Sequence, residues 1–149
     1  MLMQETSVQD QPHYSGSAFL EFVGTQLEEW RDGYVRISLE LKPHHLNRAG
    51  VVHGGLLSTL MDHAGGFCGL WCSVPGNRRV GMTLSMTCNF IAQSKTGVLT
   101  AVGERVRGGG KIYFSKTAVY TADGLLVATS TNVHRYRSGS ESVEGTPPA

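Results

Sequence analysis

"HLNRAGVVHGGLLSTLMDHAGGFCGLW", residues 45–71, is the longest apolar segment of the chain and decides its fold. On a helical wheel of about 100° per residue, the large apolar side chains lie within about 60° of the side opposite Asp62. These side chains belong to Leu56, Leu57, Leu60, Ala64, Phe67, Cys68 and Trp71. A broad apolar stripe of this kind packs against a core, so the segment predicts one long helix that runs to Trp71.

The face around Asp62 carries no side chain larger than threonine. It consists of Gly55, Ser58, Thr59, Gly65, Gly66 and Gly69. A glycine inside a helix costs about 0.5–1 kcal/mol relative to alanine, and solvent faces usually carry Lys, Glu, Gln or Arg instead. The pattern therefore predicts that another backbone or a ligand approaches the helix beside the acid. The alternative is a solvent-exposed face on which the glycines are incidental.

The flanking sequence predicts an α+β domain. "SAFLEFVG" (17–24) indicates a short helix, and the alternation within residues 25–41, broken by the turn "RDG", indicates two strands. Four more strand-like stretches follow the long helix, at about 79–90, 97–107, 111–121 and 124–137. Runs of strands around one helix are typical of a mostly antiparallel sheet with the helix on one face.

Composition excludes several classes of protein. A formal charge of +1 over 149 residues does not supply the basic face of a nucleic-acid binder. No apolar run reaches the roughly 18–20 residues that span a bilayer, and no secretory signal pattern is present at the N-terminus. Three cysteines favour reduced thiols over a disulfide framework. We therefore expect a cytoplasmic protein that binds neither nucleic acid nor membrane.

The two ends of the chain have a different composition from its middle. Residues 1–13 are polar and unpatterned, so we expect them to be disordered, and the single domain is expected to cover residues 14–137. The last segment, "SGSESVEGTPPA" (138–149), is small, polar and rich in proline at its end. This composition predicts a flexible tail.

The start of the long helix can stabilise negative charge. The first turn of a helix presents unpaired N–H groups and the positive end of its dipole. In "HGG" (53–55), a glycine at Gly55 would let a carbonyl oxygen approach one of these donors. Asn47 supplies a neutral amide nearby that can orient a water or a carbonyl. Together these features predict an oxyanion hole for an ester or thioester.

The pattern N-x2-G-x2-HGG-x6-D-x2-G in "NRAGVVHGGLLSTLMDHAG" (47–65) resembles the hotdog-fold acyl-CoA thioesterases of the phenylacetic-acid-degradation type. The order and length of the predicted elements are similar over about residues 15–137. The resemblance implies a curved antiparallel sheet wrapped around one long helix. It also implies a homodimer joined edge to edge, with two dimers pairing into a tetramer.

The resemblance also assigns roles to individual residues. Asp62 matches the catalytic carboxylate, which acts either as nucleophile or as general base toward water. Gly55 matches the N–H that polarises the thioester carbonyl, and His53 and Asn47 match supporting polar residues. Thr83, in "VGMTLSMTCNF" (80–90), stands where related enzymes hold the water with a serine hydroxyl. In that family the acid and the oxyanion donor come from different chains.

The loop "RGGGK" combines two basic residues with three glycines, a combination that can hold a phosphate. It consists of Arg107, Gly108, Gly109, Gly110 and Lys111. The resemblance places such a loop along the coenzyme A arm of the substrate, and the alternative is a flexible hairpin with solvated charges. Lys95, Arg135 and Arg137 are weaker candidates for the same contact.

No metal and no resident cofactor are expected, since coenzyme A is part of the substrate. His44, His45, His53 and His63 offer no pair at the i,i+4 spacing of helical metal ligands.

These observations predict a thioesterase that hydrolyses an aryl- or medium-chain acyl-CoA to a free acid and coenzyme A. The alternative is a non-catalytic acyl-CoA-binding hotdog module that serves as a sensor or carrier. Asp62 argues against this alternative, because such a module needs no carboxylate on the bare helix face. A hotdog dehydratase would pair an aspartate with a histidine in a different local motif, which the sequence lacks.

Overall fold

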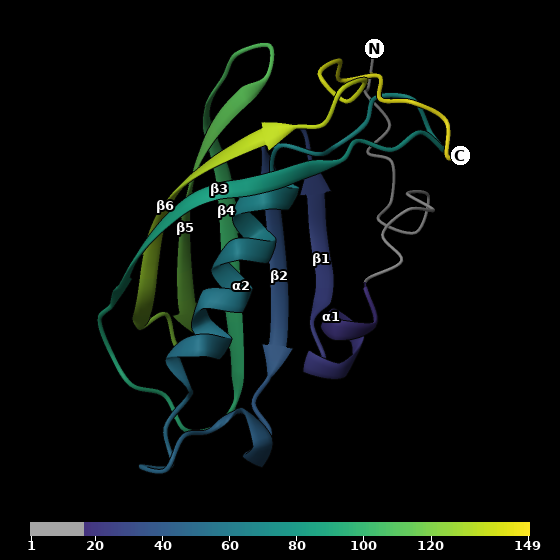
Figure 1. The fold of residues 1–149 in the computed structure, drawn as a ribbon. Helices are drawn as coiled ribbons and strands as arrows, with labels where there is room; N and C mark the ends of the chain where they lie inside the picture. The colour runs from purple at the N-terminus through teal and green to yellow at the C-terminus, as the bar shows by residue number, and fades with distance from the viewer. Residues whose placement is uncertain (1–16) are drawn as a thin grey trace.

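The computed structural model describes residues 17–149, so the disorder expected for residues 1–13 falls outside the described residues. The described chain forms two layers, a curved six-stranded sheet and the long helix α2 (Gly54–Phe67), which lies across its inner face (Figure 1). This is the α+β hotdog architecture that the sequence predicts. No helix within residues 17–149 is both long enough and apolar enough to cross a bilayer.

The order of elements along the chain also agrees with the prediction. It is α1 (Ala18–Val23), β1 (Gln26–Arg31), β2 (Tyr34–Glu40), a 3-10 turn (Pro43–His45), α2, β3 (Gly81–Phe90), β4 (Val98–Gly108), β5 (Ile112–Thr121) and β6 (Leu126–Tyr136). The strands lie in the order β1-β2-β4-β5-β6-β3, and all neighbours are antiparallel. Strand β3 therefore forms one edge of the sheet.

The core lies between α2 and the sheet. Along β2, Val35, Ile37 and Leu39 are fully buried at alternate positions, as expected for a strand with one face on a core. Helix and sheet approach closely where α2 crosses β4. A Cβ atom at Gly103 would lie 2.2 Å from the carbonyl oxygen of Ala64, so this crossing requires glycine. The close contact fixes the height of the helix above the sheet.

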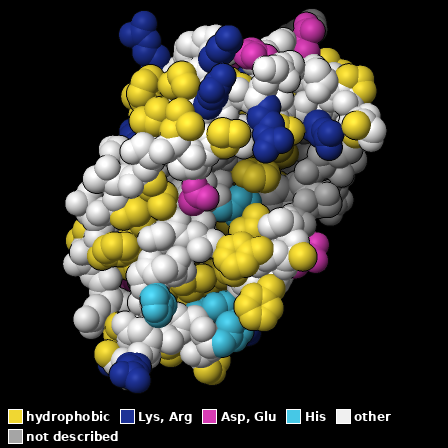
Figure 2. Space-filling view, in the orientation of Figure 1, with side chains coloured by type: hydrophobic (Ala, Val, Ile, Leu, Met, Phe, Trp, Pro, Cys, Tyr) yellow, Lys and Arg dark blue, Asp and Glu magenta, His cyan; other side chains and the backbone are white. Residues whose placement is uncertain are grey.

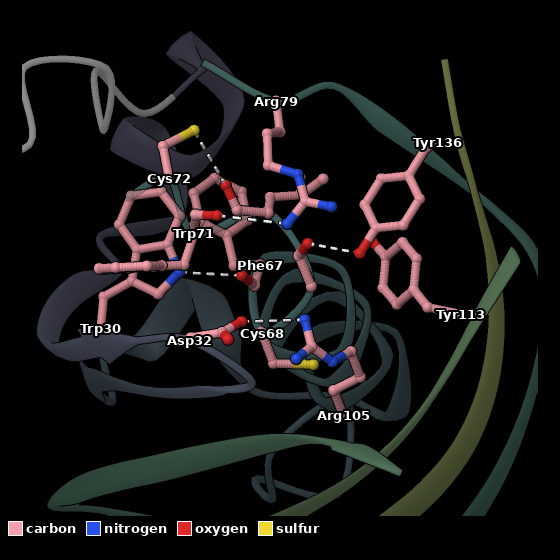
Figure 3. Close-up of polar contacts among 12 residues, drawn as sticks. Trp30, Asp32, Phe67, Cys68, Trp71, Cys72, Arg79, Arg105, Tyr113 and Tyr136 are labelled. Atoms are coloured by element: carbon pink, nitrogen blue, oxygen red, sulfur yellow. Dashed lines mark hydrogen bonds and ion pairs between the residues drawn. The ribbon is translucent and has the colours of Figure 1, made fainter. Parts of the chain in front are cut away.

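Helix α2 ends at Phe67, four residues before the predicted end at Trp71. Side chains from the sheet donate to carbonyl oxygens at and just beyond its end. Trp30 Nε1 donates to the Phe67 oxygen at 2.9 Å (Figure 3). Tyr113 Oη donates to the Gly66 oxygen (2.8 Å) and Tyr136 Oη to the Gly69 oxygen (2.8 Å). The prediction that the helix runs to Trp71 is therefore wrong.

The C-terminal segment, predicted to be a flexible tail, instead lies against residues 71–80. The buried guanidinium of Arg79 donates to the carbonyl oxygens of Ser140 (2.9 Å) and Glu141 (3.0 Å) and stacks on the Tyr136 ring. Arg78 and Thr146 exchange two backbone hydrogen bonds. Composition misled here because the partners that hold this segment are about 60 residues away along the chain.

Candidate active site

Asp62 lies on the exposed part of α2 and is hydrogen-bonded to Thr83 of β3. Thr83 Oγ1 donates to Asp62 Oδ1 at 2.6 Å. The structure thus brings together two of the predicted site residues, and both belong to one chain. Asp62 Oδ2 accepts no hydrogen bond from the described residues, so the carboxylate has one anchored oxygen and one available oxygen.

Helix α2 begins within "HGG" as predicted, but the donor that it leaves open is not the predicted one. His53 is the N-cap, and its Nδ1 accepts the Gly55 N–H at 2.9 Å. The Gly55 donor is therefore occupied, which corrects its predicted role as the donor to a carbonyl. The Gly54 N–H, at the first helical position, has no acceptor among residues 17–149. His53 acts as the cap that leaves this one donor open.

Asn47 shapes the loop before the helix with one side of its amide. Its Oδ1 accepts the N–H groups of Ala49 (2.9 Å) and Val51 (3.3 Å). Its Nδ2 has no acceptor in the described part of the chain, and the side chain is exposed. The amide is therefore held in place by its oxygen, while its N–H groups are available to a ligand.

Within one chain, the acid and the open donor are too far apart to act on the same carbonyl. Gly54 and Asp62 are eight residues apart on one helix, which corresponds to about 12 Å along its axis. A carbonyl oxygen bound at Gly54 N–H lies about 3 Å from the nitrogen, and its carbon is only about 1.2 Å further. An active site made from both groups needs a second copy of the chain.

The glycines of α2 serve the chain's own sheet more than the prediction assumed. A Cβ atom at Gly65 would lie 2.5 Å from Asn132 Nδ2 and 2.9 Å from Ser115 Oγ. One at Gly69, just beyond the helix, would lie 2.3 Å from the Tyr113 ring. Gly66, by contrast, has no atom from another part of the described chain within 4 Å of its Cβ position. The face beside Asp62 is thus open only in part, because Gly65 and Gly69 admit side chains from β5 and β6.

Comparison with known proteins agrees with this geometry. Residues 49–128, which include the helix start, Asp62 and Thr83, match the thioesterase superfamily. The chain belongs to the thioesterase superfamily. The chemistry of this enzyme is therefore thioester hydrolysis.

Solved structures similar to this thioesterase have the same fold. The conserved protein PA5202 of Pseudomonas aeruginosa is 30% identical, with a TM-score of 0.73 over 81% of this chain and 94% of that one. A hypothetical thioesterase of Streptococcus pneumoniae, solved with coenzyme A, is 26% identical, with a TM-score of 0.68 over 83% and 88% of the two chains. The PaaI protein of the Escherichia coli phenylacetic acid degradation operon, at 18% identity, shares the fold with a TM-score of 0.77 over 94% and 95%. The predicted hotdog fold is confirmed.

The thioesterase also contains buried polar residues beside Asp62 that sequence analysis missed. His134 of β6 is fully buried, with its Nδ1 3.1 Å from Thr83 Oγ1 and its Nε2 2.9 Å from Ser115 Oγ. Burial lowers the pKa of His134, and the negative charge of Asp62 opposes this shift only in part. One signal was present in the sequence: Ser130, Asn132 and His134 occupy alternate positions of one strand, where apolar residues are expected on an inner face.

A second histidine beside Asp62 is also buried. Burial lowers the pKa of His63 to about 4, against an opposing effect of the Asp62 charge. The imidazole ring packs edge-on against Phe67 at a centroid distance of 4.6 Å. His63 is therefore neutral near pH 7 and belongs to the packing of α2.

The predicted coenzyme-binding loop lies at the turn between β4 and β5. Arg107, Gly108, Gly109, Gly110 and Lys111 are all exposed. The Lys111 carbonyl accepts the Tyr136 N–H, which places the turn beside the end of β6. A groove of about 420 Å³ is lined by Met82, Arg135, Tyr136, Arg137 and Ser138, where β3 begins and β6 ends. Within the described residues, no cluster of three or more His, Cys, Asp or Glu side chains could hold a metal ion.

Proposed function

We propose that this thioesterase hydrolyses acyl-CoA to a free acid and coenzyme A, at sites shared between the two subunits of a homodimer. One observation carries the proposal: strand β3 contacts both halves of the site. Thr83, near its first end, binds Asp62, and the Phe90 ring, at its other end, lies 3.6 Å from the Cβ position of Gly54. The strand therefore runs from the acid to the open N–H.

Strand β3 is also the apolar edge of the sheet. It pairs with β6 on one side only and exposes Met82, Leu84 and Phe90, with Phe90 57% exposed. Figure 2 shows hydrophobic side chains exposed over this face of the molecule. A long apolar edge strand is a template for pairing with another chain. The occupant that fits it is a second copy, since homodimers with a two-fold axis are the commonest assemblies.

Antiparallel pairing of two β3 strands across a two-fold axis assembles the site. The Thr83 end of one strand then lies opposite the Phe90 end of the other. Asp62 of one subunit faces Gly54 and Asn47 of the partner subunit. This arrangement brings together the acid and the donors that about 12 Å of helix separates within each chain.

The chemistry follows from these positions. The thioester oxygen accepts hydrogen bonds from the Gly54 N–H, at the positive end of α2, and from Asn47 Nδ2, so charge developing on the oxygen is stabilised. Asp62 Oδ2 either attacks the carbonyl carbon or takes a proton from an attacking water. If water attacks, its C–O bond forms, the C–S bond breaks, and the proton that Asp62 took from the water passes to the coenzyme A thiolate. If Asp62 attacks, the C–S bond breaks to leave a mixed anhydride, which water then cleaves to the free acid and Asp62, with a proton from that water going to the thiolate. Thr83, which donates to Asp62, orients the carboxylate for this step.

The polar arm of coenzyme A fits the groove that Met82 and Arg135 line. Arg135 and Arg137 line this groove, and the turn that carries Arg107 and Lys111 adjoins it. Figure 2 shows several Lys and Arg side chains gathered at this end of the molecule, where they can contact the phosphates. The similar protein from Streptococcus pneumoniae was solved with coenzyme A, which supports this assignment.

The acyl group lies along the apolar edge of β3, where the Met82 end of one strand meets the Phe90 end of the other. Exposed Met82 and Phe90 provide an apolar lining, which suits an aryl or medium-length acyl chain. A cytoplasmic location, which the composition and the three cysteines favour, is a further part of the proposal. So is the pairing of two dimers into a tetramer, which rests on the family resemblance.

Replacement of the carboxylate tests the proposal. Asp62→Asn keeps the shape and the hydrogen bond from Thr83, but it removes the base or nucleophile. We expect kcat for thiol release from a panel of aryl-, short- and medium-chain acyl-CoAs to fall by at least about a hundredfold. Asp123→Asn, in the exposed turn between β5 and β6, is the matched control and should retain wild-type turnover.

Two outcomes contradict the proposal in different ways. Wild-type turnover by the Asp62→Asn variant would exclude the mechanism. Tight binding of coenzyme A without thiol release from any substrate, by the wild-type protein, would favour the non-catalytic binding module instead.

A further inference from the structure

A continuous chain of polar side chains leads from the interior of the sheet to Asp62. Ser115 and Thr117 of β5, and Ser130, Asn132 and His134 of β6, lie on the inner face of the sheet, and none is more than 4% exposed. Buried polar groups of this number are costly unless they are hydrogen-bonded to one another. Here each is bonded to the next, and the last one contacts Thr83.

The direction of the hydrogen bonds nearest to Asp62, those of Thr83, His134 and Ser115, follows from the carboxylate. An ionised carboxylate only accepts, so the Thr83 hydroxyl must donate its proton to Asp62 Oδ1. Thr83 Oγ1 must then accept from His134 Nδ1, 3.1 Å away. Neutral His134 with a proton on Nδ1 has an unprotonated Nε2, which accepts from the Ser115 hydroxyl at 2.9 Å.

The remaining hydrogen bonds, which lie further from Asp62, are also donated toward it. Ser115 Oγ, having donated its proton, accepts from Asn132 Nδ2 at 3.0 Å, and Asn132 Oδ1 accepts from Ser130 Oγ at 2.9 Å. Ser130 in turn accepts from Thr117. Every donor therefore points toward Asp62. Aligned hydrogen bonds of this kind polarise one another, so each strengthens the next.

The surroundings of His134 keep it neutral and hold it in place. The titratable groups that face it are Asp62 on α2 and Tyr113 on β5, and Cys68 lies beside Ser115. Tyr113 stacks on its ring at 4.6 Å. Burial raises the pKa of Cys68 to about 12 and raises the pKa of Tyr113 further still. Asp62 is thus the charged group among them near neutral pH.

Gly65 provides an independent observation for this chain of hydrogen bonds. Helix α2 passes so close to these hydrogen-bonded residues that any side chain at position 65 would collide with Asn132 Nδ2 and Ser115 Oγ. The helix accepts the cost of a buried internal glycine at the point where these two residues need room. The space is used for polar contacts and not for apolar packing.

We propose that His134 is a positioning residue, which holds the Thr83 hydroxyl on Asp62 through this one-way chain of donors. The anchored carboxylate then presents its second oxygen to the substrate in one fixed direction. Neither Asp62 nor Thr83 would have a unique orientation without it, since both side chains are exposed at the surface of the single chain. The proposal rests on the proposed function, in which Asp62 performs the chemistry.

Two substitutions of His134 separate a positioning role from a purely structural one. His134→Asn replaces the nitrogen that faces Thr83, whereas His134→Gln replaces the nitrogen that faces Ser115. We expect kcat to fall by about tenfold in His134→Gln, with KM unchanged, the scale of one lost hydrogen bond next to a reacting charge. His134→Asn should remain within about threefold of the wild type, because it restores the donor to Thr83.

The pH dependence provides a second readout. Donors aimed at a carboxylate favour its ionised form, so their loss makes the acid harder to ionise. The acid limb of the kcat/KM profile should move to higher pH by roughly 0.5–1 unit in His134→Gln and in Ser115→Ala. His134→Asn should leave it in place. Thr131→Val, on the outer face of β6, is the matched control and should behave as the wild type.

Equal rates and equal acid limbs in His134→Asn and His134→Gln would overturn the proposal, as would a better rate in the larger Gln variant. Melting temperatures and dimer formation are measured for each variant, so that a folding defect is recognised. The Asp62→Asn variant, assayed alongside, separates the two proposals. If it is inactive while the His134 variants keep the wild-type profile, only the positioning role fails.

Discussion

The two ends of α2 are both polar, but they are satisfied in opposite ways. At the C-terminal end, Trp30, Tyr113 and Tyr136 reach in from three strands of the sheet and donate to carbonyl oxygens at and just beyond the end of the helix (Figure 3). At the N-terminal end, His53 caps Gly55 and leaves the Gly54 N–H without an acceptor in the described chain. One end is closed by the protein's own side chains, and the other keeps a donor open.

This difference identifies where a ligand can act. A helix end that the fold has satisfied contributes to stability, whereas an open donor at the positive end of a helix binds a developing negative charge. The open end also adjoins the exposed edge strand through the contact between Gly54 and Phe90. We infer that changes at the first turn affect catalysis, and that changes at the last turn affect folding.

The largest expected effect comes from removing the open donor. Gly54 is the first helical residue, where proline is well tolerated, and His53 already has the extended conformation that precedes proline (φ −68°, ψ 134°). Gly54→Pro therefore deletes one N–H and leaves the helix intact. We expect kcat for acyl-CoA hydrolysis to fall by about 10²–10³-fold, the usual cost of one lost oxyanion donor.

Gly54→Ala is the matched control for this substitution. It keeps the N–H, and its Cβ atom would lie 3.6 Å from the Phe90 ring, an ordinary contact distance. Its kcat should stay within about threefold of the wild type. Equal losses in the alanine and proline variants would show that the donor is not the Gly54 N–H.

A smaller effect, on stability alone, is expected at the closed end. Trp30→Phe removes the donor to the Phe67 oxygen and part of the packing on the Phe67 ring. The free energy of unfolding should fall by about 1–3 kcal/mol, with kcat unchanged within about twofold. Chemical denaturation and thiol-release assays measure the two quantities. A large loss of kcat in a folded Trp30→Phe variant would contradict the claim that the C-terminal end of α2 affects stability alone.

The fold and part of the site could be predicted from the sequence. The spacing between the "HGG" start and Asp62 is local, and so is the alternation that defines the strands, because side-chain direction follows from position along one element. The sequence could not predict which N–H group of the first helical turn stays open. Whether Gly54 or Gly55 carries the open donor depends on the ring of His53 turning back onto Gly55, which is a three-dimensional contact.

Contacts between distant segments could not be predicted. The chain of donors behind Asp62 joins residues 83, 115, 132 and 134 from three strands, and no local spacing connects them. The close approach of Gly65 to Asn132 likewise depends on how the helix crosses the sheet. The C-terminal segment is held by Arg79, whose three hydrogen bonds run to backbone oxygens that composition does not reveal.

The central claim is that each active site takes Asp62 from one subunit and the Gly54 N–H from its twin, and mixing two inactive variants tests it most directly. Gly54→Pro and Asp62→Asn homodimers are dissociated together and reassociated in equal amounts. In each mixed dimer, one site then combines an intact acid from the first chain with an intact donor from the second. With random pairing, thiol release should return to about a quarter of the wild-type rate. A mixture that forms mixed dimers yet stays as inactive as its two parents would show that acid and donor act within one chain, contrary to this account.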